Sequence, residues 1–127
     1  MTPLRRMLIL ATVTGLAACE QAKTPTTIVP LEITQGTSCS LDGMLLADYP
    51  GPKAQIYYAG RGAPDFFCDT VEMFHIYLNP EQVSVARGLF VQDMGKADWD
   101  APRGQWIDAK NAYYVHGSKR RGSLGPT

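Results

Sequence analysis

Three sulfur-bearing residues lie in segments that lack helical or strand periodicity, and their chemistry suits a soft metal ion. Cys39 and Met44 share one turn-like segment with an Asp-Gly pair, and Met94 lies in a second such segment. Cu(I) prefers thiolate and thioether sulfur and accepts few ligands, so one cysteine and two methionines from separate loops could hold it. Taken singly, each methionine is more simply explained as a packing residue. Only the set indicates a metal site.

Two aspartates flank the same sulfur residues. Asp42 and Asp93 could bind or orient a metal ion, or each could cap a turn through its own backbone. Cys68 is placed differently, at the end of an expected strand and just before an expected helix, where the helix dipole would favour its thiolate. A role as a small buried apolar residue explains Cys68 as well. The residues alone leave these alternatives open.

The pattern of serines and histidines does not favour a nucleophilic enzyme. Ser38, Ser40 and Ser84 lack the G-x-S-x-G elbow, and neither Cys39 nor Cys68 has a histidine nearby in the sequence to act as its base. We therefore expect no enzymatic activity. Cys39 and Cys68 could also form a disulfide, which an oxidising compartment permits, or act together as soft ligands for Cu(I) or Zn(II).

The start of the chain is typical of a bacterial lipoprotein signal. Two arginines precede an apolar run over residues 7–16, and the small-residue stretch Leu16-Ala17-Ala18 leads directly to Cys19. The run is too short for a membrane-spanning helix, so we expect residues 1–18 to be removed as a signal peptide and Cys19 to be lipidated. The protein would then sit at the periplasmic face of a membrane. Glu20, in place of an aspartate, leaves the outer membrane open as its location.

The charge balance excludes one class of partner. The chain has 12 Lys and Arg against 12 Asp and Glu, and loss of the two signal arginines makes the remainder slightly acidic. Its one basic block is Lys119-Arg120-Arg121. Because nucleic-acid binding depends on neutralising phosphates, we do not expect a nucleic-acid partner.

The elements that must position the sulfur residues begin with a hairpin. Residues 19–33 are rich in Thr and Pro, which predicts a flexible tether. Residues 53–58 contain several β-forming residues, and a Gly- and Pro-containing turn joins them to residues 65–68. This arrangement predicts two antiparallel strands.

A helix is expected directly after the hairpin. Asp69 and Glu72 form a D-x-x-E capping pattern, in which the aspartate accepts from a free amide at the helix start. Asn79-Pro80 should end the helix. The apolar spacing predicts one shared face, formed by Val71, Phe74, His75 and Leu78.

A third strand over residues 88–92 completes the expected order of strand, strand, helix, strand. Residues 34–98 therefore predict one ββαβ unit of the α+β class. β character returns at 105–107 and 112–115, with no helix after it to cover a face. We expect residues 99–127 to form a second, incomplete unit.

With these residues in place, five segments taken in order closely resemble the NosL family of copper-chaperone lipoproteins: Cys39–Met44 (CSLDGM), Pro50–Ile56 (PGPKAQI), Phe66–Phe74 (FFCDTVEMF), Leu89–Met94 (LFVQDM) and Trp106–Ala109 (WIDA). The resemblance implies two related ββαβ units similar to the organomercurial-lyase core. It also implies that the copper site is formed by Cys39, Asp42, Met44 and Met94. Family members usually continue beyond the Gly-Pro-Thr at 125–127 with a helix and a strand that complete the second unit.

The function implied by the resemblance is copper delivery. The protein is expected to carry Cu(I), with Zn(II) as an alternative ion, and to supply copper to nitrous-oxide reductase near an ABC-type maturation complex. The competing interpretation is a structural or docking lipoprotein without metal, in which Cys39 and Cys68 form a disulfide and the methionines only pack.

Overall fold

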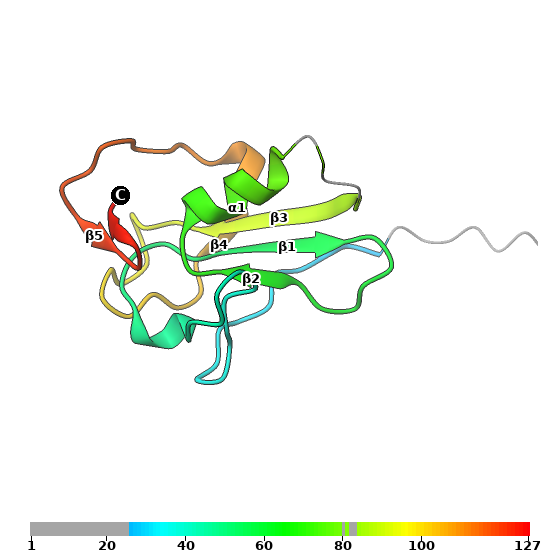
Figure 1. Ribbon diagram of the computed structural model, residues 1–127, viewed down its shortest axis with the longest axis horizontal. Helices are drawn as coiled ribbons and strands as arrows, with labels where there is room; N and C mark the ends of the chain where they lie inside the picture. Colours follow the sequence, from blue (N-terminus) through cyan, green and yellow to red (C-terminus); the bar gives the residue numbers. More distant parts are fainter. Residues whose placement is uncertain (1–25, 80, 82–83) are drawn as a thin grey trace, which may run out of the picture.

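A computed structural model describes residues 26–79, 81 and 84–127, and these residues form an α+β domain, as predicted. The predicted signal peptide and the lipidation site at Cys19 lie outside the described residues. The main sheet has four strands in the order β2-β1-β3-β4, and a separate two-stranded hairpin follows (Figure 1). In chain order the elements are η1 (Leu46–Asp48), β1 (Ala54–Tyr58), β2 (Asp65–Phe67), α1 (Thr70–Tyr77), β3 (Ala86–Gln92), β4 (Trp106–Asp108), η2 (Ala109–Asn111), β5 (Arg121–Gly122) and β6 (Gly125–Pro126).

Strand β1 lies between β2 and β3 and is antiparallel to both. The predicted hairpin is confirmed, with Ala54 opposite Phe67 in β2. On the other side, Ala54 lies opposite Val91 in β3. Strands β2 and β3 therefore run in the same direction and end at the same edge of the sheet. At the usual strand spacing, Phe67 and Val91 are about 10 Å apart there.

Helix α1 covers one face of the sheet, and the main core lies between them (Figure 1). The predicted capping residue is confirmed, since the Asp69 side chain accepts a hydrogen bond from the amide of Val71. Of the face predicted from the apolar spacing, Phe74 packs against the main core, whereas Val71 and Leu78 are more than half exposed. The buried helix residue is Met73, which lies outside that predicted set.

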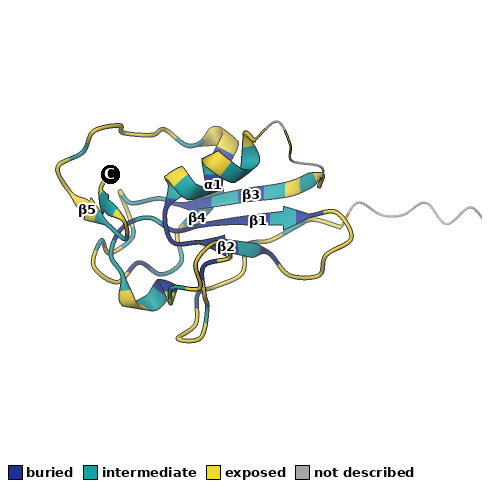
Figure 2. Cartoon of the chain, viewed as in Figure 1, coloured by how far each residue is buried: buried dark blue, intermediate teal, exposed yellow. Residues whose placement is uncertain are grey.

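A second, smaller core contains both cysteines of the folded part. It consists of Ile33, Cys39, Leu46, Phe66 and Cys68, with Met44 and Trp106 packed against it. Figure 2 shows the buried strands beside exposed loops. The cysteines thus lie at the boundary between packed sheet and surface loop.

The last residues of the expected tether lie against the sheet instead of extending freely. The Leu31 amide donates to Gln55 Oε1, and Gln55 Nε2 donates to the Leu31 carbonyl, both at 2.9 Å. Ile33 is buried in the second core. The side-chain amide of a buried glutamine needs such partners, and this explains why the segment up to residue 33 is held.

Residues after 99 extend the main sheet. Strand β4 pairs with β3, with Ile107 opposite Val91. The expected strand at 112–115 is absent, because Tyr114 turns back to donate to the Ala109 carbonyl at 2.6 Å and packs edge-on against Phe74. The division of the domain between residues 98 and 99 stays a prediction. Within the described part of the chain, no helix has the length and apolar character needed to cross a membrane.

Candidate metal centre

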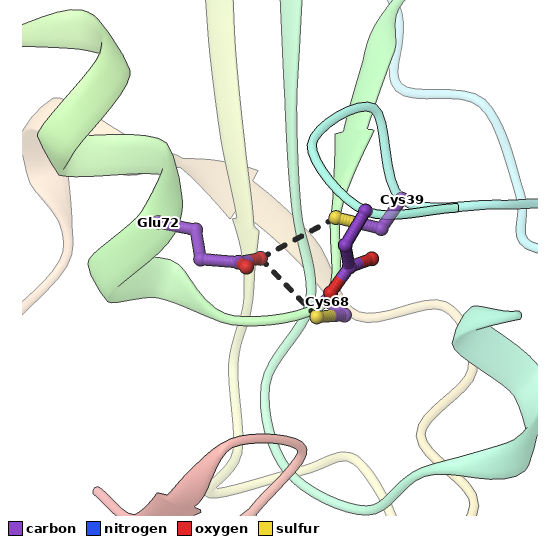
Figure 3. Close-up of side chains that lie close together, drawn as sticks. Cys39, Cys68 and Glu72 are labelled. Atoms are coloured by element: carbon purple, nitrogen blue, oxygen red, sulfur yellow. Dashed lines mark hydrogen bonds between the residues drawn. The ribbon is translucent and has the colours of Figure 1, made fainter. Parts of the chain in front are cut away.

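Four acidic and thiol side chains meet at the edge of the sheet where β2 ends. They are Cys39, Asp42, Cys68 and Glu72, and one donor atom from each lies within 4.8 Å of all the others. A loop supplies the first two, the junction between β2 and α1 supplies Cys68, and α1 supplies Glu72. Figure 3 shows both sulfur atoms directed toward the Glu72 carboxylate.

The loop that carries Cys39 is fixed by its own backbone. Cys39 donates to the Met44 carbonyl at 2.8 Å and accepts from the Gly43 amide at 3.0 Å. Gly43 has a φ of 79°, a conformation that favours glycine. The Asp42 side chain caps the turn by accepting from the Met44 amide at 2.9 Å. The sequence Cys-x-x-Asp-Gly-Met therefore forms a tight turn that presents Cys39.

One backbone hydrogen bond attaches this turn to the sheet. The Ser40 amide donates to the Phe66 carbonyl of β2 at 2.8 Å. Because Phe66 is two residues before Cys68, this bond brings the Cys39 turn alongside the end of β2. Two cysteines 29 positions apart in the sequence thus become neighbours.

Glu72 joins the two thiols. Its Oε2 accepts from Cys39 Sγ at 3.4 Å and from Cys68 Sγ at 3.2 Å. Side chains in the first turn of a helix point back toward its start, so a glutamate three residues after the Asp69 cap reaches the strand end. The sequence pattern identified Glu72 as a capping residue, and in the structure its carboxylate is occupied by the thiols.

Burial and the neighbouring carboxylate both stabilise the protonated form of Cys68. Burial raises the pKa of the Cys68 thiol well above its usual range, and the hydrogen bond to Glu72 raises it further. Nearby, burial lowers the pKa of the Lys53 ammonium to about 8, although the charge of the Asp69 carboxylate opposes that change. In the metal-free protein Cys68 therefore holds a proton that a bound cation would displace.

The arrangement suits a single metal ion. A metal–sulfur bond is about 2.3 Å long, so two donors on opposite sides of one ion lie about 4.6 Å apart. The 4.8 Å limit of the cluster is close to that span. Two thiols select a soft ion, and two carboxylates can complete or orient the coordination.

Of the four site residues expected from the sequence, Cys39 and Asp42 belong to the cluster of acidic and thiol side chains, and Met44 packs against the core that contains both cysteines. Met94 lines a cavity of about 520 Å³ with Trp99 and Tyr113. It follows β3 at the same edge of the sheet at which β2 ends.

Cys68 and Glu72 belong to the cluster but not to the site predicted from the sequence. The sequence leaves Cys68 open as a thiolate, a packing residue or a partner of Cys39, and its four-residue spacing to Glu72 across a helix start is the signal that points to the cluster. Both cysteines are free thiols in the structure. Asp93 behaves as a turn cap, since its Oδ1 accepts from the Gly95 amide at 3.0 Å.

Comparison with known proteins identifies relatives over most of the chain. The NosL family model matches residues 30–127. The chain is 40% identical over 127 residues to the copper-binding lipoprotein NosL of Achromobacter cycloclastes, covering 98% of this chain and 65% of that protein. It is 37% identical over 113 residues to the copper-binding lipoprotein NosL of Stutzerimonas stutzeri, covering 87% and 58% respectively. The chain thus spans less than two thirds of the length of either relative.

A solved structure shows the same fold. The crystal structure of the copper chaperone NosL from Shewanella denitrificans superposes with a TM-score of 0.72 at 32% sequence identity. The match covers 82% of this chain and 77% of that one.

Proposed function

Because the chain belongs to the NosL family, we propose that it binds Cu(I) as cargo and delivers it for assembly of the copper centres of nitrous-oxide reductase. The relatives named as copper-binding lipoproteins and as a copper chaperone support this proposal. Their names describe binding proteins rather than enzymes, in keeping with the absence of a base beside either thiol in the sequence.

The observation that carries the proposal is the meeting of two thiols on one carboxylate. Cys39 and Cys68 arrive from separate segments, and both lie within hydrogen-bonding distance of Glu72. Although they are 29 residues apart in the sequence, the two sulfur atoms are close enough to bind one metal ion without any movement of the backbone. A purely structural pair of cysteines would not require a shared anionic acceptor.

We propose a ligand set centred on these two thiolates. Asp42 and Glu72 would supply carboxylate oxygens, and Met44 would supply a thioether from the Cys39 turn. Met94 remains part of the proposal as a ligand from the second loop. Its contribution requires the segment after β3 to approach the cluster, so we expect it to matter less than Cys39.

The donor chemistry favours Cu(I) over Zn(II) when thioether sulfur takes part, because zinc sites in proteins use thiolate, imidazole and carboxylate. With only thiolates and carboxylates, zinc would also fit. X-ray absorption at the copper edge, on protein purified without oxygen, should show sulfur in the first coordination shell. A spectrum with only oxygen and nitrogen neighbours would contradict the proposed site.

Variants locate the site. Cys39→Ala and Met44→Ala are each expected to weaken Cu(I) binding at least about tenfold in competition with a chromophoric chelator. His75→Ala is the matched control, because His75 is exposed on α1 and should leave affinity unchanged. Unchanged affinity in both loop variants would place the site elsewhere.

Anchoring belongs to the same proposal. A lipid on Cys19 would hold the protein at the periplasmic face of a membrane, which raises its effective concentration near an ABC-type maturation complex without a strong interface. Labelling with a radioactive fatty acid tests the anchor. Wild-type protein should incorporate the label and Cys19→Ala should not, and label in the variant would refute lipidation at this residue.

A further inference from the structure

We propose that Ser123 and Lys53 are positioning residues that hold Cys68 in place for metal binding. The inference rests on the proposed metal site, because Cys68 matters only if its sulfur is a ligand. Neither residue belongs to the cluster of donors. Their role is to fix the backbone from which the Cys68 side chain projects.

The contacts converge on the Cys68 carbonyl. The Ser123 hydroxyl donates to it at 2.6 Å, and Lys53 Nζ donates to it at 3.3 Å. Lys53 Nζ also donates to Ser123 Oγ at 2.6 Å and to the Pro50 carbonyl at 2.9 Å. The ammonium thus has an acceptor for each of its three protons.

Burial makes these contacts consequential. Lys53 and Cys68 are both completely buried, and a buried ammonium is tolerated only when its protons are hydrogen-bonded. Removing the Ser123 hydroxyl would deprive both the ammonium and the Cys68 carbonyl of a partner. The small network is therefore sensitive to the loss of a single oxygen.

Ser123 reaches this network because the hairpin that carries it is held firmly. Ser123 lies between β5 and β6, and this hairpin lies beside the end of the sheet where β1 begins (Figure 1). A Cβ added to Gly51 would come within 2.8 Å of the Gly122 Cα, so two backbones pack directly there. The Trp99 indole donates to the Arg121 carbonyl at 2.9 Å, and the Arg120 guanidinium stacks on its ring.

The hairpin therefore connects a distant part of the sequence to the metal-binding junction. Ser123 is 55 residues from Cys68 and 70 from Lys53. When the hairpin is docked, the β2–α1 junction cannot shift without breaking the Ser123 and Lys53 bonds. When it is released, the junction that carries Cys68 can open to solvent.

The test is the reactivity of each thiol in the metal-free, full-length protein. Alkylation by iodoacetamide is followed cysteine by cysteine, by mass spectrometry of peptides. In Ser123→Ala the alkylation rate of Cys68 is expected to rise about tenfold. The variant lacks the hydrogen bonds of Ser123 to the Cys68 carbonyl and to the Lys53 ammonium, so opening the β2–α1 junction to expose the thiol costs less free energy. The rate at Cys39 is expected to stay within about twofold, since its turn is fixed by other bonds.

Ser118→Ala is the matched control in the same segment. Ser118 Oγ accepts from the Arg120 amide, outside the Lys53 network, so this variant should leave both thiols at their wild-type rates. Equal acceleration of Cys39 and Cys68 in Ser123→Ala would indicate general loosening and overturn the proposal, as would an unchanged Cys68 rate. Because the assay contains no copper, its outcome does not depend on whether the protein proves to bind that ion.

Discussion

A Glu72→Gln substitution is expected to make the Cys68 thiol more reactive in the metal-free protein. The wild-type carboxylate accepts from Cys68 Sγ at 3.2 Å and from Cys39 Sγ at 3.4 Å. Its charge opposes formation of the Cys68 thiolate. Glutamine keeps the shape of the side chain, removes the charge, and offers an amide that can donate to a thiolate.

The size of the effect follows from the distance. Two unit charges 3.2 Å apart interact by about 5 kcal/mol at an effective dielectric constant of about 20. Glu72 is only half-buried, and solvent screening reduces this value by at least half. An energy of about 2 kcal/mol corresponds to about a 30-fold change in the thiolate population. Burial, the larger cause of the raised pKa of Cys68, remains in the variant.

The assay is the alkylation rate of Cys68 measured across a range of pH. In Glu72→Gln the profile should move to lower pH, so that at one mildly alkaline pH the rate rises about 10- to 30-fold. The Ser123→Ala variant instead should raise the rate at every pH, because it changes exposure rather than charge. Glu81→Gln, on an exposed residue after α1, is the control. A profile that stays in place, or moves to higher pH, would refute the electrostatic reasoning.

Cys68→Ser is expected to weaken Cu(I) binding at least about 100-fold, since loss of an outer-sphere partner alone costs 10- to 100-fold; wild-type affinity in a chelator competition would remove Cys68 from the ligands. The Cys68 thiol, whose pKa is raised by burial, must lose its proton to bind metal, so affinity should rise with pH near neutrality by up to about tenfold per pH unit on account of Cys68, and Cys68→Ser should remove that part of the slope. Folding lowers the pKa of Lys53 from 10.5 to about 8. Between these two pH values Lys53 is therefore protonated in the unfolded chain and neutral in the folded protein. As pH rises through this window, the free energy of unfolding of the wild type should therefore increase by about 3 kcal/mol relative to that of Lys53→Met. If denaturant titrations show the same difference between the two proteins at every pH, the lowered pKa of Lys53 is contradicted.

Local signals in the sequence were sufficient for the helix start but not for the site built on it. Asp69 was predicted as the cap, and it accepts from the Val71 amide as expected. Glu72 was assigned to the same cap, yet it accepts from two thiols. Its contact with Cys39 depends on the Ser40–Phe66 backbone bond, and no local pattern encodes a pairing between residues so far apart.

The strand predicted at residues 112–115 is wrong, because the β propensity of its side chains does not match how they pack. Tyr113 and Val115 are β-forming residues, but both are largely exposed in a segment without strand pairing. Tyr114 is held instead by a hydrogen bond to Ala109 and by the ring of Phe74. β propensity describes fit to a half-buried pleated surface, and Tyr113 and Val115 do not meet such a surface because the chain folds back at Tyr114 and leaves them exposed.

The four donors differ in how firmly the protein holds them, and this difference bears on release as well as binding. Cys68 is fully buried and its backbone is held by Lys53, whereas Asp42 is exposed on a turn that is stabilised mainly by its own bonds. If the protein transfers copper as proposed, a ligand from a receiving protein would replace an exposed oxygen donor before any sulfur is uncovered. Such stepwise exchange would keep the ion bound by sulfur throughout, so that tight retention and transfer would be compatible. The β2–α1 junction would then provide the rigid side of the proposed site, and the Cys39 turn would provide the accessible side.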